Sequence, residues 1–181
     1  MSNLLNIELY RKFHQYLPIL CVDIILTTVD GKFLMVKRKK EPAKGKWWFV
    51  GGRVFKNESL EQAIRRKVKE EIGLIIGNVE KIISGYEIMF KEDPFNHGNG
   101  THNNVTCFLS TIENIDNIKF NEDITSNTTQ RVISGLTDKE NLYIVADVSN
   151  EFDDPTEFSH NYVIKYNFKN KSTRVHSLPI N

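Results

Sequence analysis

The segment from residue 51 to 74, GGRVFKNESLEQAIRRKVKEEIGL, carries enough local signals to specify its own structure. Ser59 is followed three residues later by Gln62, a capping box that predicts the start of a helix. Gly73 suits the left-handed conformation that ends many helices. Apolar side chains recur at spacings of three and four, at Leu60, Ala63, Ile64, Val68 and Ile72. This spacing predicts a helix with one face buried against a sheet.

The charged side chains of this predicted helix lie away from its apolar face. Arg66 and Glu70 are one turn apart, as are Lys67 and Glu71, so each pair can form an ion pair. Two adjacent carboxylates near a glycine turn also supply the oxygen donors that Mg2+ shares with substrate phosphates. The charges alone leave two interpretations open, a metal site or a solvated face stabilised by ion pairs.

The spacing within this segment resembles the signature of Nudix hydrolases. The matching positions are Gly52, Glu58, Arg66, Val68, Glu70, Glu71, Gly73 and Leu74. The resemblance implies an α/β fold in which a mixed β-sheet is sandwiched between α-helices. It further implies that Glu71, its neighbour Glu70 and the carbonyl of Gly51 hold Mg2+, or Mn2+ in its place, on a diphosphate. Arg66 would belong to the catalytic machinery, and the usual reaction would be hydrolysis of a nucleoside diphosphate linked to another group.

One position departs from that signature. The family's arginine is followed by glutamate, whereas Arg66 is followed by Lys67. An ammonium in place of a third carboxylate lowers the negative charge of the site, so the sequence predicts one bound Mg2+ rather than several. The departure either impairs attack at phosphorus or marks a branch with different chemistry.

Residues 38–54 resemble the corresponding segment of GDP-mannose mannosyl hydrolases, a Nudix branch that also lacks the glutamate. The resemblance covers residues 17–74, although a proline usual before the two glycines is missing. In that branch water attacks the anomeric carbon of the sugar, and GDP leaves with its charge held by magnesium and arginines. The resemblance implies the same bond cleavage for this chain.

Three further residues are candidates for substrate binding. Asp23 lies inside a predicted strand, and a buried carboxylate is costly unless paired, so it is expected to face a cleft or a cation. The resemblance implies that Asp23 and Arg38 bind substrate, and the alternative for Arg38 is an exposed charge at a strand end. Arg53 follows the glycine pair, where its planar fork suits the oxygens of a leaving diphosphate. It is therefore both a binding and a catalytic candidate.

The remaining pattern predicts strands around this segment. Residues 19–29 and 32–38 flank an Asp-Gly pair typical of a tight hairpin. Residues 79–90, 105–112 and 162–168 are also expected to form strands, with a polar loop over 92–103. Residues 4–16 have helical spacing, and His14 within them is expected at the surface.

Composition limits the class of protein. With 181 residues, 40% of them hydrophobic, the chain is expected to form one Nudix domain over residues 17–168, between an N-terminal helix over 1–16 and a tail over 169–181. The net charge of +1 predicts no general attraction to nucleic acid or membranes. Two isolated cysteines are expected to be buried thiols, which suits the cytoplasm, and neither a signal peptide nor a membrane-length apolar run is expected.

The general base stays open at this stage. The resemblance suggests His102, because Thr101 and His102 match a Thr-His pair of the mannosyl hydrolases. The Gln-His pair that holds magnesium and acts as base in that branch has no counterpart here, and a carboxylate such as Glu122 or Asp123 could replace it. His160 competes with His102, because it follows a similar aromatic, acid and proline pattern.

The sequence therefore predicts a Mg2+-dependent hydrolase of a small nucleotide sugar, with GDP-mannose as the first substrate to test and GDP and free sugar as products. One alternative is attack at phosphorus on ADP-ribose or a similar substrate. Another is a nucleotide-sugar binding module that has lost catalysis. A homodimer is expected from the resembling branch.

Overall fold

The structure, a computed structural model, describes residues 6–29, 32–113, 118–120, 133–134, 136–137, 141–148, 160–167, 169–170 and 172–178. The chain divides into two compact units, Met1–Ile133 and Ser134–Asn181. The division falls inside residues 17–168, which were expected to form one domain. None of the described helices is long and apolar enough to cross a membrane.

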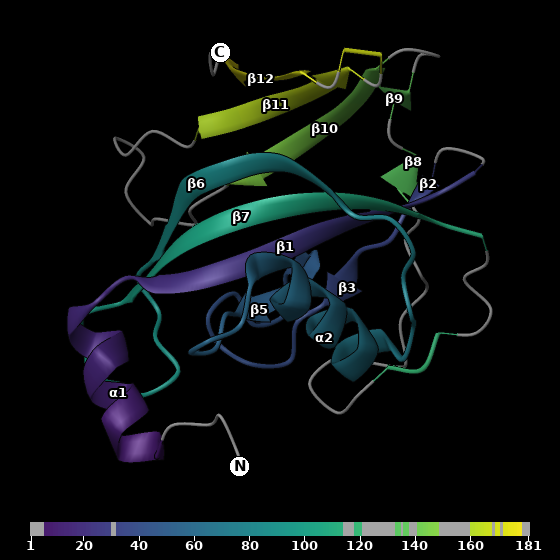
Figure 1. Cartoon of the computed structure of the whole chain (residues 1–181). Coiled ribbons are helices and arrows are strands. Elements are labelled where there is room, and N and C mark those ends of the chain that lie inside the picture. Colours follow the sequence, from purple (N-terminus) through teal and green to yellow (C-terminus); the bar gives the residue numbers. More distant parts are fainter. Residues whose placement is uncertain are drawn as a thin grey trace. The chain divides into compact units, whose positions relative to one another are not determined.

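The first unit is built on a mixed β-sheet (Figure 1). Its central strand β1 (Ile19–Thr28) runs parallel to β7 (Thr101–Ile112) and antiparallel to β2 (Lys32–Phe33) and β5 (Val50–Arg53). Strand β6 (Glu80–Phe90) pairs antiparallel with β7. The short strands β3 (Val36–Lys37) and β4 (Trp47–Trp48) form a separate ladder, and β8 (Ile133–Ser134) spans the boundary of the two units. The predicted α/β class and mixed sheet are confirmed.

Helix α2 (Leu60–Ile72) confirms the local signals of its sequence. Ser59 and Gln62 form both hydrogen bonds of a capping box, and Gly73 ends the helix with φ of 72°. The predicted apolar face packs against β1 and β5 and joins the main core, in which Ile64, Val68 and Ile72 are buried. Strand β1 is buried over most of its length, as expected for a central strand covered on both faces.

Helix α1 (Ile7–Tyr16) confirms the predicted helix, with Asn6 as its N-cap, and residues 1–5 lie outside the described part. The expectation that His14 lies at the surface is wrong. Its side chain is turned toward the loop between β6 and β7, and only 6% of its surface is exposed. The face of α1 that carries His14 packs against the domain, while Ile7, Leu9 and Phe13 are exposed.

The loop between β6 and β7 is shorter than predicted, because β7 begins at Thr101 rather than at 105. Gly98 and Gly100 have positive φ, which tightens the return of the chain. A Cβ at Gly100 would overlap the carbonyl oxygen of Phe90, so the glycine permits the close approach that continues the β6–β7 ladder to its end. His102 therefore lies in a strand, not in a loop.

The second unit contains an antiparallel sheet. Its order is β12-β11-β10-β9, formed by β9 (Leu136–Thr137), β10 (Asn141–Val148), β11 (His160–Asn167) and β12 (Ser172–Leu178). The predicted strand over 162–168 corresponds to β11, but the predicted tail over 169–181 is wrong, because it contains β12. Asn167 Oδ1 accepts hydrogen bonds from the backbone nitrogens of Lys169 and Asn170, which turns the chain back for pairing.

Candidate active site

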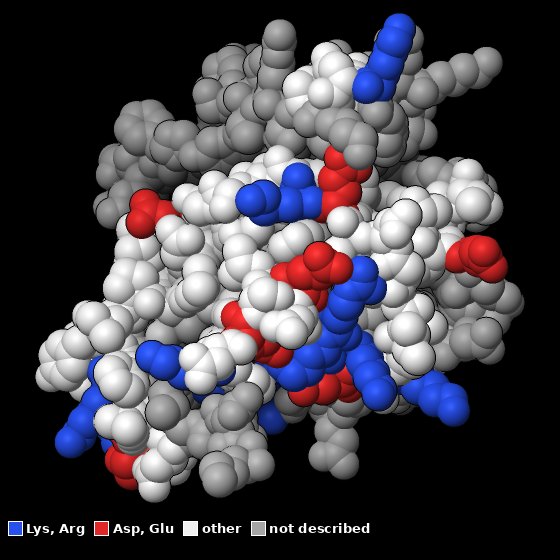
Figure 2. All heavy atoms as spheres, viewed as in Figure 1, with Lys and Arg blue, Asp and Glu red and all other residues white. Residues whose placement is uncertain are grey.

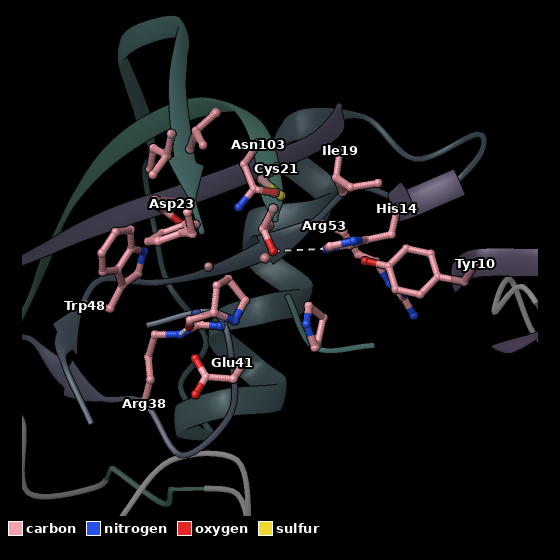
Figure 3. A pocket seen from close by; sticks show the side chains of 18 residues that line it. Tyr10, His14, Ile19, Cys21, Asp23, Arg38, Glu41, Trp48, Arg53 and Asn103 are labelled. Carbon is pink, nitrogen blue, oxygen red and sulfur yellow. Dashed lines mark hydrogen bonds between the residues drawn. The ribbon is translucent and has the colours of Figure 1, made fainter. Parts of the chain in front are cut away.

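A pocket of about 190 Å³ lies at one end of the sheet in the first unit. Figure 3 shows side chains from β1, from β5, from the 38–48 segment and from α1 turned toward it. Four of the residues predicted for the site line it, namely Asp23, Arg38, Gly51 and Arg53. The volume is below the range of roughly 300–1,000 Å³ for a whole small-molecule site, so it suits one part of an extended ligand.

Asp23 is the buried acid of the pocket, as its place in a strand predicted. Only 6% of its surface is exposed, and the hydroxyl of Tyr86 donates to its Oδ2 at 3.2 Å. Loss of solvent raises the pKa of Asp23 to about 7, although the hydrogen bond from Tyr86 and the charge of Arg38 oppose the rise. A carboxyl with such a pKa can accept or release a proton near neutral pH.

Arg38 and Arg53 bring positive charge to the pocket. The Nε of Arg38 donates to the carbonyl of Pro42 at 2.8 Å, which fixes the guanidinium beside Asp23. The guanidinium of Arg53 lies 4.0 Å from the ring centroid of Tyr10 and 5.5 Å from that of Phe55. This arrangement suits an anionic ligand.

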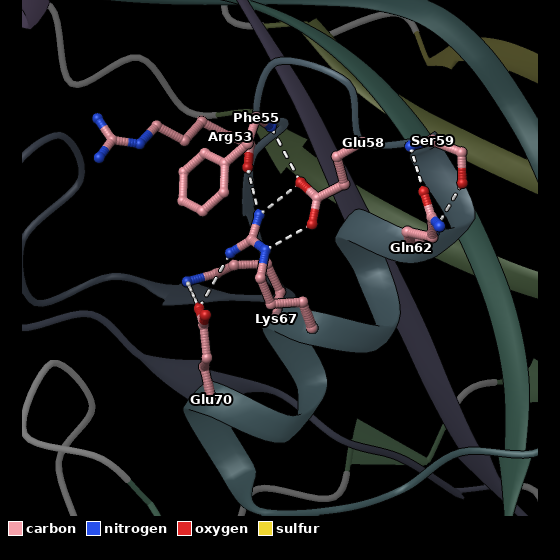
Figure 4. Close-up of polar contacts among 8 residues, drawn as sticks. Arg53, Phe55, Glu58, Ser59, Gln62, Lys67 and Glu70 are labelled. Carbon is pink, nitrogen blue, oxygen red and sulfur yellow. Dashed lines mark hydrogen bonds and ion pairs between the residues drawn. The ribbon is translucent and has the colours of Figure 1, made fainter. Parts of the chain in front are cut away.

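The guanidinium of Arg66 binds groups of the chain itself, and Figure 4 shows two of its partners, Glu58 and Glu70. Its Nε and Nη2 bind both oxygens of Glu58 at 2.6 and 2.9 Å, and its Nη1 binds Glu70 at 3.0 Å. Its Nη2 also donates to the carbonyl of Arg53, and its guanidinium lies 3.9 Å from the ring centroid of Phe55. Hydrogen bonding to Arg66 lowers the pKa of Glu58. Arg66 therefore ties the glycine loop to α2.

The two helix carboxylates share one ammonium. Lys67 Nζ lies 2.6 Å from Glu71 Oε1 and 3.6 Å from Glu70 Oε2, so the predicted pairing of Lys67 with Glu71 is confirmed. The lysine stem crosses Gly52, where a Cβ would come within 2.8 Å of Lys67 Cε. Figure 2 shows positive and negative side chains side by side over this helix. Burial raises the pKa of Glu71, although Lys67 and a hydrogen bond from the backbone of Gly51 oppose this.

The two carboxylates of this helix are oxygen donors of the kind that a hard cation binds. Glu71 is mostly buried, with 14% of its side chain exposed, and lies against the backbone of Gly51, while Glu70, at the preceding position, is half exposed. Within the described part of the chain, no cluster of three or more His, Cys, Asp or Glu side chains could hold a metal. Carboxylate oxygens suit Mg2+, and the ammonium of Lys67 competes for them.

His102 lies away from the pocket. Successive side chains of a strand face opposite sides, and Thr101 and Asn103 line the pocket. His102 Nε2 instead lies 3.2 Å from Glu87 Oε1, with 34% of its side chain exposed. The structure thus separates His102 from the other predicted site residues. His160 begins β11 in the second unit, and Glu122 and Asp123 lie outside the described residues.

Sequence reasoning missed a buried histidine pair at the rim of the pocket. His14 Nδ1 lies 2.7 Å from His97 Nε2, and the backbone nitrogen of Asn99 donates to His97 Nδ1 at 3.2 Å. His97 therefore carries its proton on Nε2 and donates it to His14. His14 Nε2 then donates to Thr101 Oγ1 at 3.4 Å, and the Thr101 hydroxyl donates to the carbonyl of Glu92. The one-turn spacing of Tyr10 and His14 is the sequence signal that could have revealed this inward face.

His14 must be neutral in this chain of hydrogen bonds, because its Nδ1 accepts from His97, and this predicts a pH dependence. Burial and the neighbouring His97 lower the pKa of His14 below its usual 6.5, while Asp93 opposes the change. The stabilisation is thus complete above pH 6.5 and is lost as the pH falls through the lowered pKa. The raised pKa of Asp23 acts in the opposite direction over this range, so the test is the difference between two chains. In urea unfolding at pH 5, 6, 7 and 8, wild type should lose stability toward pH 5 relative to His14→Gln. His102→Gln should keep the wild-type dependence, and an unchanged slope in His14→Gln would contradict this role.

Comparison with known proteins supports the family resemblance. A model of the NUDIX domain matches residues 17–128. The chain is 31% identical over 102 residues to the low-salt glycan biosynthesis protein Agl8 of Haloferax volcanii, which covers 56% of this chain and 64% of that protein. It is 44% identical over 66 residues to an ADP-ribose pyrophosphatase of Methanocaldococcus jannaschii, covering 36% of this chain and 38% of that relative. The matches thus span less than two thirds of either relative.

Solved structures agree on the fold. A MutT/nudix family protein from Enterococcus faecalis superposes with a TM-score of 0.52 at 20% identity, covering 99% of this chain and 64% of that chain. At this identity the likeness concerns the fold alone. The domain match covers more than half of the chain and includes α2 and the glycine turn. The chain therefore belongs to the Nudix hydrolase family.

Proposed function

We propose that this chain is a Mg2+-dependent hydrolase of a nucleotide sugar, with GDP-mannose as the first substrate to test. The observation that carries the proposal is the buried Glu71 carboxylate, which lies against the backbone of Gly51 in a glycine turn that borders a pocket with two arginines. Nudix hydrolases generally use divalent metals, and Mn2+ could replace Mg2+. Glu71 would be the principal metal ligand. Glu70 and the carbonyl of Gly51 would be the other ligands that the protein supplies.

The bound cation would neutralise charge on the diphosphate of the substrate. Arg38 and Arg53 would bind the leaving nucleoside diphosphate, whose negative charge grows as the bond to the sugar breaks. Water would attack the anomeric carbon and displace the diphosphate oxygen, which gives GDP and free sugar. Asp23 is suited to accept the proton of that water, because it is buried at the pocket with a pKa near neutrality.

Attack at phosphorus is the second candidate reaction. It is favoured by the 44% identity over 66 residues to a relative named as an ADP-ribose pyrophosphatase. The substrate would then be ADP-ribose or a similar compound, and a nucleoside monophosphate would be released. A binding module without catalysis is the third candidate, motivated by the ammonium of Lys67 between the two carboxylates.

One experiment separates the three candidates. The chain is incubated with a panel of nucleotide sugars and ADP-ribose, with Mg2+ or Mn2+, in 18O-labelled water. Label in the sugar means attack at carbon, and label in a phosphate means attack at phosphorus. Tight binding without turnover across the panel would support the binding module. The expected homodimer remains a prediction that sedimentation can test.

Removing the ammonium of Lys67 is expected to strengthen metal binding. The 2.6 Å contact with Glu71 must be broken before a cation can use that oxygen, so Lys67→Met should bind Mn2+ about tenfold more tightly or better. Lys67→Glu should bind it more tightly still. Electron paramagnetic resonance of free Mn2+ measures this without turnover. Lys69→Met makes the same charge change at an exposed position of α2 and should leave the affinity unchanged. Equal affinities of wild type and Lys67→Met would contradict the competition.

A further inference from the structure

We infer that helix α1 is a wall of the substrate pocket and that Tyr10 positions Arg53 there to bind the diphosphate of the ligand. The NUDIX domain match begins at residue 17, so α1 lies before the matched part of the chain. Tyr10 and His14 nevertheless line the same pocket as Asp23 and Arg53. The inference rests on the proposed function in one respect, namely that the ligand carries a diphosphate.

Arg53 and Arg66 are held in different ways, and the difference separates their roles. Arg66 is neutralised by two oxygens of Glu58 and one of Glu70. Within the described part of the chain, Arg53 has no carboxylate at ion-pair distance, and its guanidinium lies over the face of Tyr10. An aromatic face attracts a cation without neutralising it, so the N–H groups at the edge of the guanidinium keep their capacity for an anion.

Tyr10 is the main contact that fixes the end of the Arg53 side chain. Its ring centroid lies 4.0 Å from the guanidinium carbon, compared with 5.5 Å for Phe55, whose ring is nearer to Arg66 at 3.9 Å. Figure 3 shows Tyr10 and Arg53 together at the end of the pocket that also holds His14. A long arginine side chain loses conformational entropy on binding an anion, and a fixed side chain has already lost most of it.

Helix α1 is itself held in register with the pocket. The chain of hydrogen bonds through His14, His97 and Thr101 ties its inner face to the loop after β6 and to the start of β7. The Asn99 side chain also donates to the carbonyl of Gln15 at 3.1 Å, and Phe95 contacts Tyr10 edge to face with ring centroids 5.4 Å apart. Polar and aromatic contacts of defined geometry therefore set the position of Tyr10.

The test is the affinity for GDP and ADP in the presence of Mg2+, measured by calorimetry on the full chain. Tyr10→Leu should weaken binding of the diphosphate that wild type prefers by about tenfold, because the cation–π contact is lost. Tyr10→Phe keeps the ring and should bind like wild type. Tyr16→Leu removes a tyrosine from the same helix that is 72% exposed and should have no effect. With an active substrate, Tyr10→Leu should lower kcat as well as raise KM, because Arg53 would bind a charge that grows as the bond to the sugar breaks.

A double-mutant cycle distinguishes positioning from a general loss of structure. Because Tyr10 acts through Arg53, Tyr10→Leu combined with Arg53→Ala should bind no more weakly than Arg53→Ala alone. Additive losses, or wild-type affinity in Tyr10→Leu, would overturn the inference. A second measurement needs neither ligand nor a stable variant. The ring current of Tyr10 should shift the NMR signals of the Arg53 side chain upfield in the wild-type chain.

The two hypotheses fail in distinguishable ways. If wild type binds neither GDP nor ADP, the proposed function is wrong, and the Arg53 signals alone decide the inference about α1. Signals shifted upfield in wild type and in Tyr10→Phe, but not in Tyr10→Leu, would support it. Unshifted Arg53 signals in the wild-type chain would overturn it.

Discussion

Glu71→Gln should reduce turnover by about a hundredfold or more, since several kcal/mol of charge stabilisation depend on the cation that this carboxylate would hold. The substitution keeps the shape of the side chain and an oxygen that can accept from the backbone of Gly51. It removes the negative charge and leaves Lys67 without the partner at 2.6 Å. The measurement is kcat with the substrate identified by the panel, together with Mn2+ affinity, which should fall in parallel.

Glu61→Gln is the matched control for this prediction. Glu61 lies on the same helix and pairs with Arg65 at 2.8 Å, but both side chains are exposed. Such a surface pair contributes little, so turnover and Mn2+ affinity should stay at wild-type values. Full turnover in Glu71→Gln would exclude this carboxylate as the principal metal ligand, and with it the proposed site.

Gly51→Ala should lower the free energy of unfolding by about 3 kcal/mol or more. A Cβ at this position would overlap both the Oδ1 of Asp23 and the backbone carbonyl of Val22. The side chain of Asp23 could move, but the Val22 carbonyl belongs to β1 at the place where it pairs with β5. The strand pair must therefore separate, and the glycine turn must shift relative to α2. Urea denaturation measures the loss.

Gly77→Ala tests whether the loss is specific. A Cβ there would meet no atom within 4 Å, so stability should stay within about 0.5 kcal/mol of wild type. If Gly51→Ala were as stable as Gly77→Ala, the close approach of β5 to β1 at this turn would be wrong.

Local sequence determined helix α2 and its ion pairs. The capping box of Ser59 and Gln62, the left-handed Gly73 and the pairing of Lys67 with Glu71 all connect residues within four positions of each other. Their geometry follows from the helix alone, so it could be predicted without knowing the rest of the fold. The prediction of a mixed sheet had a different basis, namely the resemblance to the Nudix family.

Tertiary contacts decided how the site is assembled. His14 and His97 are 83 positions apart in the sequence, and Asp23 and Tyr86 are 63 positions apart. No local sequence pattern could therefore predict that they form pairs. The early start of β7 turned His102 away from the pocket, and the ring of Tyr10 came to lie over Arg53. By itself the sequence determined the helix that carries the carboxylates, because helix signals act within one or two turns. Only the folded chain decided which side chains share the pocket, because those contacts depend on strand register and on the docking of α1.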